Sequence, residues 1–455
     1  MVPSKKCGFT KDARIHPSGP NVLFLYAGSL LFKFLFFCYG EYTVEVLRLL
    51  DRREKIIMNQ SIRVLISGAS ITGPALAYWL HHYGFDVTVI ERAPALRSGG
   101  YGVDIRGTAI TMLRRMGILD QVRAADTQMT GVYFVNSKGK IEGKISEASL
   151  ANQQGLDIEI MRDDLSSILY DLTKDNIKYI WGDSITAIHE TEAGAEVQFI
   201  HSNPQTFDLV IGADGLHSNV RSLTFGDEEQ FKRTLGCYIS IFTMENYLNL
   251  DHRQLFYSTP GKTVGMYSAR DNTEAKGMLI FQSEALKYDR YDEESQKKLV
   301  ENAFEDQMGW ETSHILKTMK EAPDFYFDEI CQIHMPTWAK GRIALVGDAA
   351  YCPSPLSGQG TSLALVGAYV LAGELKARNG DYSRAFVAYE QEMRKFVEKN
   401  QKIGLMAAGS MVEKSNLKIF LRNLILRVPF LLVMQFKLIS KMVVKAANGI
   451  ELKDY

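Results

Sequence analysis

The sequence has few cysteines and no closely spaced pair of them. They stand at Cys7, Cys38, Cys237, Cys331 and Cys352. This spacing excludes a CxxC redox pair and a zinc knuckle, so we expect reduced thiols and no metal site. We expect Cys352 to be a small buried side chain rather than a reactive one.

The chain also lacks an excess of charge of either sign. Its 52 basic and 53 acidic residues leave a formal net charge of −1, which gives no field that would attract a polyanion. We therefore expect no nucleic-acid partner. No HExxH motif and no Ser-His-Asp arrangement is found, and His217, at the start of an expected helix, is interpreted as structural.

Long uncharged apolar runs are absent except near the N-terminus. The stretch from Val22 to Tyr39 has one lysine, Lys33, and residues 1–57 differ in composition from the rest of the chain. They are either a membrane anchor or an extension upstream of a true start at Met58. Residues 411–455 are apolar but regularly interrupted by lysine and arginine, and Pro429 divides them into two amphipathic helices. These helices either lie on a membrane or pack across the mouth of the main domain.

Residues 63–92, RVLISGASITGPALAYWLHHYGFDVTVIER, predict strand, glycine turn, helix and strand. An apolar run from Val64 to Ile66 is followed by helical spacing from Pro74 to Gly84. Two strands joined through a helix of this length lie parallel, so the stretch predicts a βαβ unit.

The turn in this unit is a GxGxxG pattern with its middle glycine replaced: Gly68, Ser70 and Gly73. In dinucleotide-binding units such a turn places the pyrophosphate at the helix N-terminus. Glu91 follows Gly68 by 23 residues, where a carboxylate can accept hydrogen bonds from ribose hydroxyls. Nucleotide binding is favoured over a merely structural turn.

Two further strand-to-turn motifs come later in the chain. In DLVIGADGLHSNVR, residues 208–221, an apolar strand ends at Asp214 and Gly215. In GRIALVGDAAYCPSPLSGQG, residues 341–360, a buried strand ends before Asp348, which is expected at the carboxyl end of the sheet, where α/β folds bind ligands.

These three stretches, in this order, resemble the class A flavoprotein monooxygenases, the family of para-hydroxybenzoate hydroxylase. The resemblance runs from Met58 to about residue 411. It implies an α/β fold in which a Rossmann-like FAD-binding domain (58–233 and 339–410) carries an inserted mixed β-sheet substrate domain (234–338) and C-terminal helices (411–455).

The resemblance also implies site residues. Glu91 is expected on the adenosine ribose, and Asp214 and Gly215 on both FAD and NAD(P)H. Asp348 is expected near the ribityl chain and pyrophosphate, and the loop from Pro355 to Gly360 along the flavin ring. There Gly358 and Gly360 would let backbone N–H groups approach a ring that gains negative charge on reduction. The arginines expected along the cofactor are Arg92, Arg97, Arg106 and Arg162, of which Arg97 also fits an exposed surface charge.

More narrowly, the loop from 341 to 360 and the stretches GWET, DFYFDEI and GGYGVDIRG are similar to those of the tetracycline destructases. We expect NADPH or NADH to reduce FAD, and O₂ then to supply one oxygen atom to an aromatic or enolic polycyclic substrate. The candidate substrate-binding residues are Tyr238, Phe242, Met266 and Phe281, which also fit an ordinary core. A cytoplasmic monomer is expected.

Two alternatives stay open. One is a reductase or epoxidase of an apolar isoprenoid substrate, which would suit the apolar ends of the chain. The other is a flavin-binding sensor without enzymatic activity.

Overall fold

The computed structural model of the chain describes residues 61–97, 99–146, 157–307, 309–427 and 440–455. Residues Ile62–Tyr455 form one compact unit. The expectations for residues 1–57 and for a helix break at Pro429 lie outside the described residues. Within the described residues, no helix combines the length and the apolar character needed to cross a bilayer.

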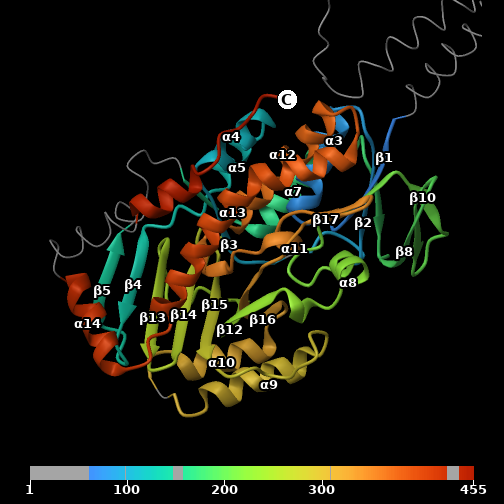
Figure 1. Cartoon of the computed structure of the whole chain (residues 1–455). Helices are drawn as coiled ribbons and strands as arrows, with labels where there is room; N and C mark the ends of the chain where they lie inside the picture. The colour runs from blue at the N-terminus through green and yellow to red at the C-terminus, as the bar shows by residue number, and fades with distance from the viewer. Residues whose placement is uncertain (1–60, 98, 147–156, 308, 428–439) are drawn as a thin grey trace, which may run out of the picture. The chain divides into compact units, whose positions relative to one another are not determined.

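The predicted βαβ unit is confirmed and lies at the centre of a six-stranded sheet (Figure 1). The strands in spatial order are β17 (Ala339–Lys340), β18 (Ile343–Leu345), β11 (Leu209–Gly212), β1 (Arg63–Ser67), β2 (Asp86–Glu91) and β7 (Lys178–Trp181). All neighbours pair in parallel except β17 with β18. Val64, Leu65 and Ile66 of β1 are fully buried, as expected of a parallel sheet covered on both faces.

Helices that pack on one another and on this sheet bury its apolar strands. They are α3 (Thr72–His82), α4 (Thr108–Arg115), α5 (Leu119–Ala124), α7 (Arg162–Thr173), α8 (Asn219–Phe225), α11 (Asp348–Tyr351), α12 (Gly360–Ala377) and α13 (Tyr382–Met411). Helix α12 is buried from Thr361 to Leu375 because, apart from the ion-paired Glu374, its side chains are small or apolar on every face. It packs against α3, α4 and α13, so it lies at the centre of the helical layer.

A second, seven-stranded sheet is mixed. Its order is β16 (Phe325–Ile333), β12 (Lys232–Met244), β15 (Glu274–Gln282), β14 (Lys262–Ala269), β13 (Arg253–Thr259), β4 (Gly131–Val135) and β5 (Ile141–Ser146). Five of these strands fall in or next to the predicted insert, 234–338. However, β4 and β5 come from residues 131–146, and β4 pairs in parallel with β13. The boundaries of the inserted domain, 234–338, therefore stay a prediction. The sheet of that domain also contains two strands, β4 and β5, that come earlier in the chain.

The remaining elements connect or cover these sheets. Helices α9 (Glu293–Phe304) and α10 (Thr312–Glu321) lie along one face of the seven-stranded sheet, as Figure 1 shows. The others are β3 (Gly102–Ile105) paired with β6 (Ile158–Met161), the β10–β9–β8 sheet (Gln205–Phe207, Gly194–Phe199, Ile185–Thr191), the short helices η1 (Glu228–Gln230) and η2 (Pro355–Ser357), and helix α14 (Asn416–Arg427).

Candidate functional site

The three motif turns meet at the carboxyl edge of the six-stranded sheet. Strands β1, β11 and β18 are parallel neighbours, so the residues that follow them emerge together. The backbone N–H of Ala213 donates to Ser67 O at 2.8 Å, and that of Val346 donates to Gly212 O at 2.9 Å. The chain thus brings the first glycine turn, the Asp214 turn and the Asp348 loop into one site, as their positions after strands predicted.

Glycine is required at both ends of the first turn. Gly68 has a φ of +107°, and a Cβ there would lie 2.5 Å from Ala213 O. At Gly73 a Cβ would lie 1.8 Å from Gly68 O. These two residues therefore let the turn close tightly and let α3 begin directly against it.

Ser70, which replaces the middle glycine, meets Arg162. The Arg162 Nη1 donates to Ser70 Oγ at 2.8 Å, while the Arg162 backbone N–H donates to Tyr101 O at 3.0 Å. Arg162 is the first residue of α7, so the start of that helix is fixed beside the turn. Two of the predicted site residues are thereby brought together, and the serine has a partner that glycine would lack.

Glu91 reaches the same turn from the end of β2. Its Oε2 accepts a hydrogen bond from Ala69 N–H at 2.9 Å, and its Oε1 accepts one from Ala93 N–H at 2.9 Å. Each carboxylate oxygen can accept a further bond, so Glu91 can still receive a ribose hydroxyl. The Arg97 Nη2 lies 3.6 Å from Glu91 Oε1, with 58% of the arginine side chain exposed.

The other two predicted arginines, Arg92 and Arg106, differ in their surroundings. The exposed Arg92 donates to the hydroxyl of Tyr291 and lies over its ring, with 5.0 Å between guanidinium carbon and ring centroid. It is not directed at the glycine turn. Arg106 instead pairs with Asp104 at 3.0 Å, and its Nε is buried without a hydrogen-bond partner among the described residues.

The Asp214 turn has a largely structural hydrogen-bond pattern. Asp214 accepts from Ser218 Oγ at 2.5 Å and from Val220 N–H at 3.1 Å. Burial raises the pKa of Asp214, although these hydrogen bonds partly offset the effect. At Gly215, with a φ of +78°, the Cβ position has open space around it within the described residues.

The Asp348 loop presents a carboxylate that is costly to ionise. Burial raises the pKa of Asp348 to about 6, and a hydrogen bond with Cys352 opposes the rise. A Cβ at Gly360 would lie 3.8 Å from Asp348 Oδ1, so the carboxylate faces the start of α12. Pro355 begins the short helix η2, and Gly358 follows in the left-handed region with a φ of +59°. Cys352 is buried, as expected.

Sequence reasoning missed two carboxylates beside this loop, Asp104 and Glu159. A Cβ at Gly358 would lie 2.8 Å from Asp104 Oδ2. Burial raises the pKa of Glu159, and the charge of Asp104 adds to the rise. In the sequence, the stretch GGYGVDIRG pointed to the region of Asp104. Only the pairing of β3 with β6 shows that Asp104 and Glu159 lie opposite each other on neighbouring strands.

The site fits a dinucleotide cofactor by its unpaired donors and acceptors. Among the described residues no side chain caps α3 or α12, so the first N–H groups of both helices remain available. The fully buried amide of Gln359, the N-cap residue of α12, has neither its nitrogen nor its oxygen paired within the described residues. Together with the Arg106 Nε, these groups match the needs of a polar, anionic ligand such as FAD.

The four candidate substrate residues lie elsewhere. Tyr238, Phe242, Met266 and Phe281 are at most 3% exposed and pack in the cluster beneath α9 and α10. The structure does not bring them to the Asp348 loop, so we assign them to the core. Because side chains alternate along a strand, the neighbouring positions face the other way.

That opposite face of the seven-stranded sheet meets the loop. Ile239, Ile241 and Ile280 form a separate apolar cluster, against which Leu356 of η2 and Tyr326 of β16 pack. The three isoleucines are themselves buried, and they form the apolar cluster nearest the candidate cofactor loop.

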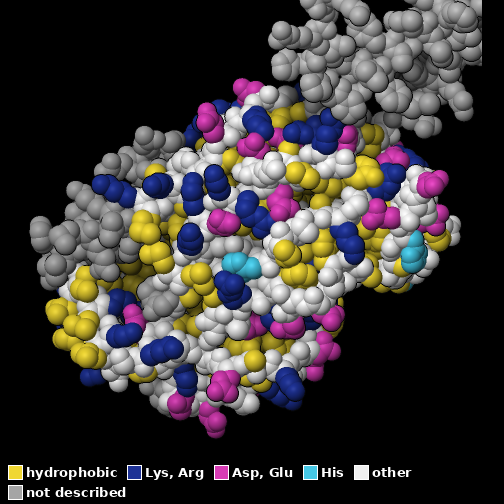
Figure 2. Space-filling model, in the orientation of Figure 1, with side chains coloured by type: hydrophobic (Ala, Val, Ile, Leu, Met, Phe, Trp, Pro, Cys, Tyr) yellow, Lys and Arg dark blue, Asp and Glu magenta, His cyan; other side chains and the backbone are white. Residues whose placement is uncertain are grey.

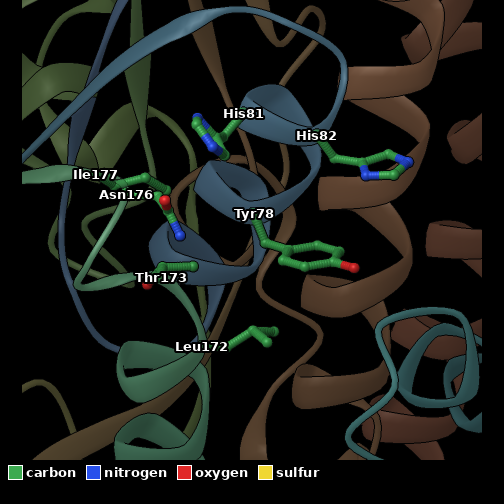
Figure 3. A pocket seen from close by; sticks show the side chains of 7 residues that line it. All are labelled: Tyr78, His81, His82, Leu172, Thr173, Asn176 and Ile177. Carbon is green, nitrogen blue, oxygen red and sulfur yellow. The ribbon is translucent and has the colours of Figure 1, made fainter.

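A small cavity lies away from the motif turns, between the C-terminal ends of α3 and α7 (Figure 3). It has a volume of about 100 Å³ and is lined by residues that include His81, His82 and Asn176. Since α3 begins at the glycine turn and ends at this cavity, the two are separated by the length of the helix. We assign the cavity no role in the site.

Comparison with known proteins agrees with this geometry. A family model described as an FAD binding domain matches residues 61–402. The chain is 47% identical over 341 residues to an uncharacterized protein of Mycobacterium tuberculosis, covering 74% of this chain and 91% of the relative. It is 42% identical over 357 residues to a flavin-dependent monooxygenase of Legionella longbeachae, covering 78% and 91%.

Two solved structures are also similar. The tetracycline destructase Tet(55) matches with a TM-score of 0.75 and 39% identity, over 87% of this chain and 99% of that one. Tet(51) matches with a TM-score of 0.76 and 36% identity, over 87% and 100%. With its three converging turns and its matched FAD-binding domain, the chain belongs to the class A family of flavin-dependent monooxygenases.

Proposed function

We propose that the chain uses NADPH or NADH and O₂ to hydroxylate an aromatic or enolic polycyclic substrate. The observation that carries this proposal is the contact between Leu356, in the predicted flavin loop, and the apolar sheet face of Ile239 and Ile241. A cofactor along that loop would have an extended apolar surface beside it, which suits a flat, largely apolar substrate.

The residues that would hold FAD follow from the geometry. The turn from Gly68 to Gly73 and the uncapped start of α3 are suited to the pyrophosphate, and Glu91 to the adenosine ribose. Asp348 and Gly215 would contact the central part of the cofactor. Arg162, tied to Ser70, would add positive charge near the phosphates.

The reactive end would lie against the loop from Pro355 to Gly360. When bound, FAD supplies the electron transfer and oxygen activation that side chains cannot. The protein's part is electrostatic: the uncapped start of α12 directs N–H groups and a partial positive charge at this place, which stabilises negative charge on a bound ring. The apolar cluster around Ile241 would keep water from the atoms that react.

We further propose a tetracycline as the substrate, because Tet(55) and Tet(51) are tetracycline destructases at 39% and 36% identity. Such an activity would give antibiotic resistance. The test is to mix purified full-length protein, FAD, NADPH and tetracycline in air and to follow the drug's long-wavelength absorbance and the product mass. A product heavier by one oxygen atom supports the proposal. NADPH oxidation that yields only hydrogen peroxide contradicts tetracycline as substrate.

The same assay with an isoprenoid in place of tetracycline tests the first alternative. Without oxygen a monooxygenase or epoxidase stops, whereas a reductase of isoprenoid double bonds continues. A flavin-binding sensor would retain FAD without steady NADPH consumption. Parallel reactions with NADH in place of NADPH show which of the two reduces the protein.

We further propose that the protein works as a monomer in the cytoplasm.

A further inference from the structure

Helix α14 carries four of its apolar side chains on the outside. Leu417, Phe420, Leu421 and Leu424 are 67%, 61%, 45% and 43% exposed. Their spacing of three, four and seven residues places them in one stripe along the helix. Figure 2 shows hydrophobic side chains gathered where Figure 1 places α14. Single exposed apolar residues are ordinary, but a continuous helical stripe marks an interaction surface.

The opposite face of α14 holds it to the protein through both apolar and polar side chains. Leu426 packs against Gly143, and Ile419 is half-buried. Asn423 is buried, and its Nδ2 donates to Glu142 Oε2 at 2.9 Å. The Arg422 guanidinium lies over the ring of Phe134, with 4.1 Å between its carbon and the ring centroid, and Arg427 Nε donates to Glu142 O at 2.6 Å. These apolar and polar contacts together fix the direction in which the stripe faces.

The fully exposed charges beside the stripe are positive, and the adjacent Glu413 is half-buried. Lys414 and Lys418 are exposed, and neither makes an ion pair within the described residues. Helix α14 itself contains no acidic residue. An apolar stripe flanked by exposed lysines is the pattern of helices that lie in the headgroup region of an anionic membrane.

We propose that α14 docks on an anionic lipid surface, with the stripe of Leu417, Phe420, Leu421 and Leu424 entering the headgroup boundary and Lys414 and Lys418 contacting the headgroups. A second copy of the chain fits less well, because a symmetric contact through α14 would bring like charges together. The proposal does not depend on the proposed oxygenation activity.

The test is co-sedimentation of the full-length, FAD-loaded protein with phosphatidylcholine vesicles, made with or without phosphatidylserine. Binding is expected with phosphatidylserine and is expected to weaken about tenfold or more in the variant L417S/F420S/L424S. The matched control is I200S/L223S/V387S, which removes three comparably exposed apolar residues outside α14 and should bind like wild type.

The charge is tested separately. The variant K414Q/K418Q should lose about fivefold in affinity per lysine for phosphatidylserine vesicles and little for phosphatidylcholine alone. Three results would overturn the proposal: an unchanged affinity in the serine variant, equal loss in the matched control, or equal binding to both vesicle types. A dimer in sedimentation velocity without vesicles that dissociates in the serine variant would assign the stripe to a second copy instead.

Discussion

His217 Nε2 lies 3.0 Å from a carboxylate oxygen of Asp328, and this contact joins the turn after β11 to strand β16 of the other sheet. The Nδ1 of the same ring lies 2.9 Å from Glu228 Oε1. Burial by itself lowers the pKa of His217, but the hydrogen bonds with Asp328 and Glu228 outweigh it and raise the pKa to about 9. The histidine is thus an imidazolium that connects the candidate cofactor site to the sheet beside it.

The ionisable groups around His217 do not titrate between pH 6.5 and 9. Arg221 pairs with Glu228, and the hydroxyls of Tyr288 and Tyr326 reach Asp328. The pKa values of both tyrosines are raised, chiefly by burial. Between pH 6.5 and 9 the titration at this contact is therefore that of the imidazole.

The first prediction concerns stability and pH. The folded protein binds this proton more tightly than the unfolded chain, so the stabilisation is complete below about pH 6.5 and is lost as pH rises through about 9. In the variant H217Q, the apo-protein should lose stability on the order of 2 kcal/mol at about pH 6.5 and little at about pH 9.5. Thermal unfolding midpoints of both proteins across this range measure it. An equal loss at both pH values would contradict the assignment.

The second prediction concerns Ser70 and Arg162. Because the guanidinium donates to Ser70 Oγ, R162A should weaken FAD binding about 10- to 100-fold. The variant S70G, which completes the GxGxxG pattern, should weaken it about fivefold rather than strengthen it, since the arginine loses its anchor. Fluorescence titration of apo-protein with FAD measures both. Tighter binding by S70G would show that the serine is only tolerated.

The third prediction concerns Gly358. Alanine there must adopt a left-handed conformation, at a cost of about 1–2 kcal/mol, and its Cβ would push Asp104 aside. Gly261 offers a matched control, because it has a similar positive φ, +77°, with nothing within 4 Å of its Cβ position. Both G358A and G261A should unfold at lower temperature, but only G358A should bind FAD more weakly. Similar FAD affinities in the two variants would remove the loop from the cofactor site.

The fourth prediction concerns Asp348. Its pKa is raised from 3.8 to about 6, so the folded state binds more protons than the unfolded state between these values, and the ionised carboxylate destabilises the fold above pH 6. D348N should therefore stabilise the apo-protein at about pH 8 by roughly 1–3 kcal/mol, with little effect at about pH 4. The same variant should retain less FAD on gel filtration. Full retention would show that Asp348 does not hold the cofactor.

The fifth prediction separates the two faces of the seven-stranded sheet. I241A alters the face next to Leu356 and should raise the KM for the polycyclic substrate severalfold. F242A opens a cavity under α9 and α10, so it should cost about 3–5 kcal/mol of stability and leave the KM nearly unchanged. Steady-state kinetics and thermal unfolding of both variants provide the comparison. The reverse pattern would return the substrate to the Phe242 face.

The convergence of the three turns could be predicted from the sequence because it depends on strand order alone. Residues that follow neighbouring parallel strands emerge at one edge, whatever the loops do, and Gly68, Asp214 and Asp348 each follow an apolar run. The partnership of Arg162 with Ser70 required the structure, since it depends on where α7 begins.

The face of the inserted sheet could not be predicted in the same way. Alternation along β12 separates Tyr238 and Phe242 from Ile239 and Ile241, but both sets are apolar. Both sets are buried, and only the structure shows that the first packs under α9 and α10 while the second packs against Leu356. Similarly, the pattern of α14 is amphipathic in either orientation, and the contacts of Asn423 and Arg422 with residues far away in sequence decide which face is exposed.

The central claim is that the three turns together bind FAD, and a spectrum of the purified protein tests it most directly. Full-length protein should be incubated with excess FAD, freed of unbound cofactor and examined by visible absorption. We predict the flavin bands, at a concentration equimolar with the chain and lost on denaturation into the free-FAD spectrum. Protein that is folded but remains colourless after this treatment would contradict the account.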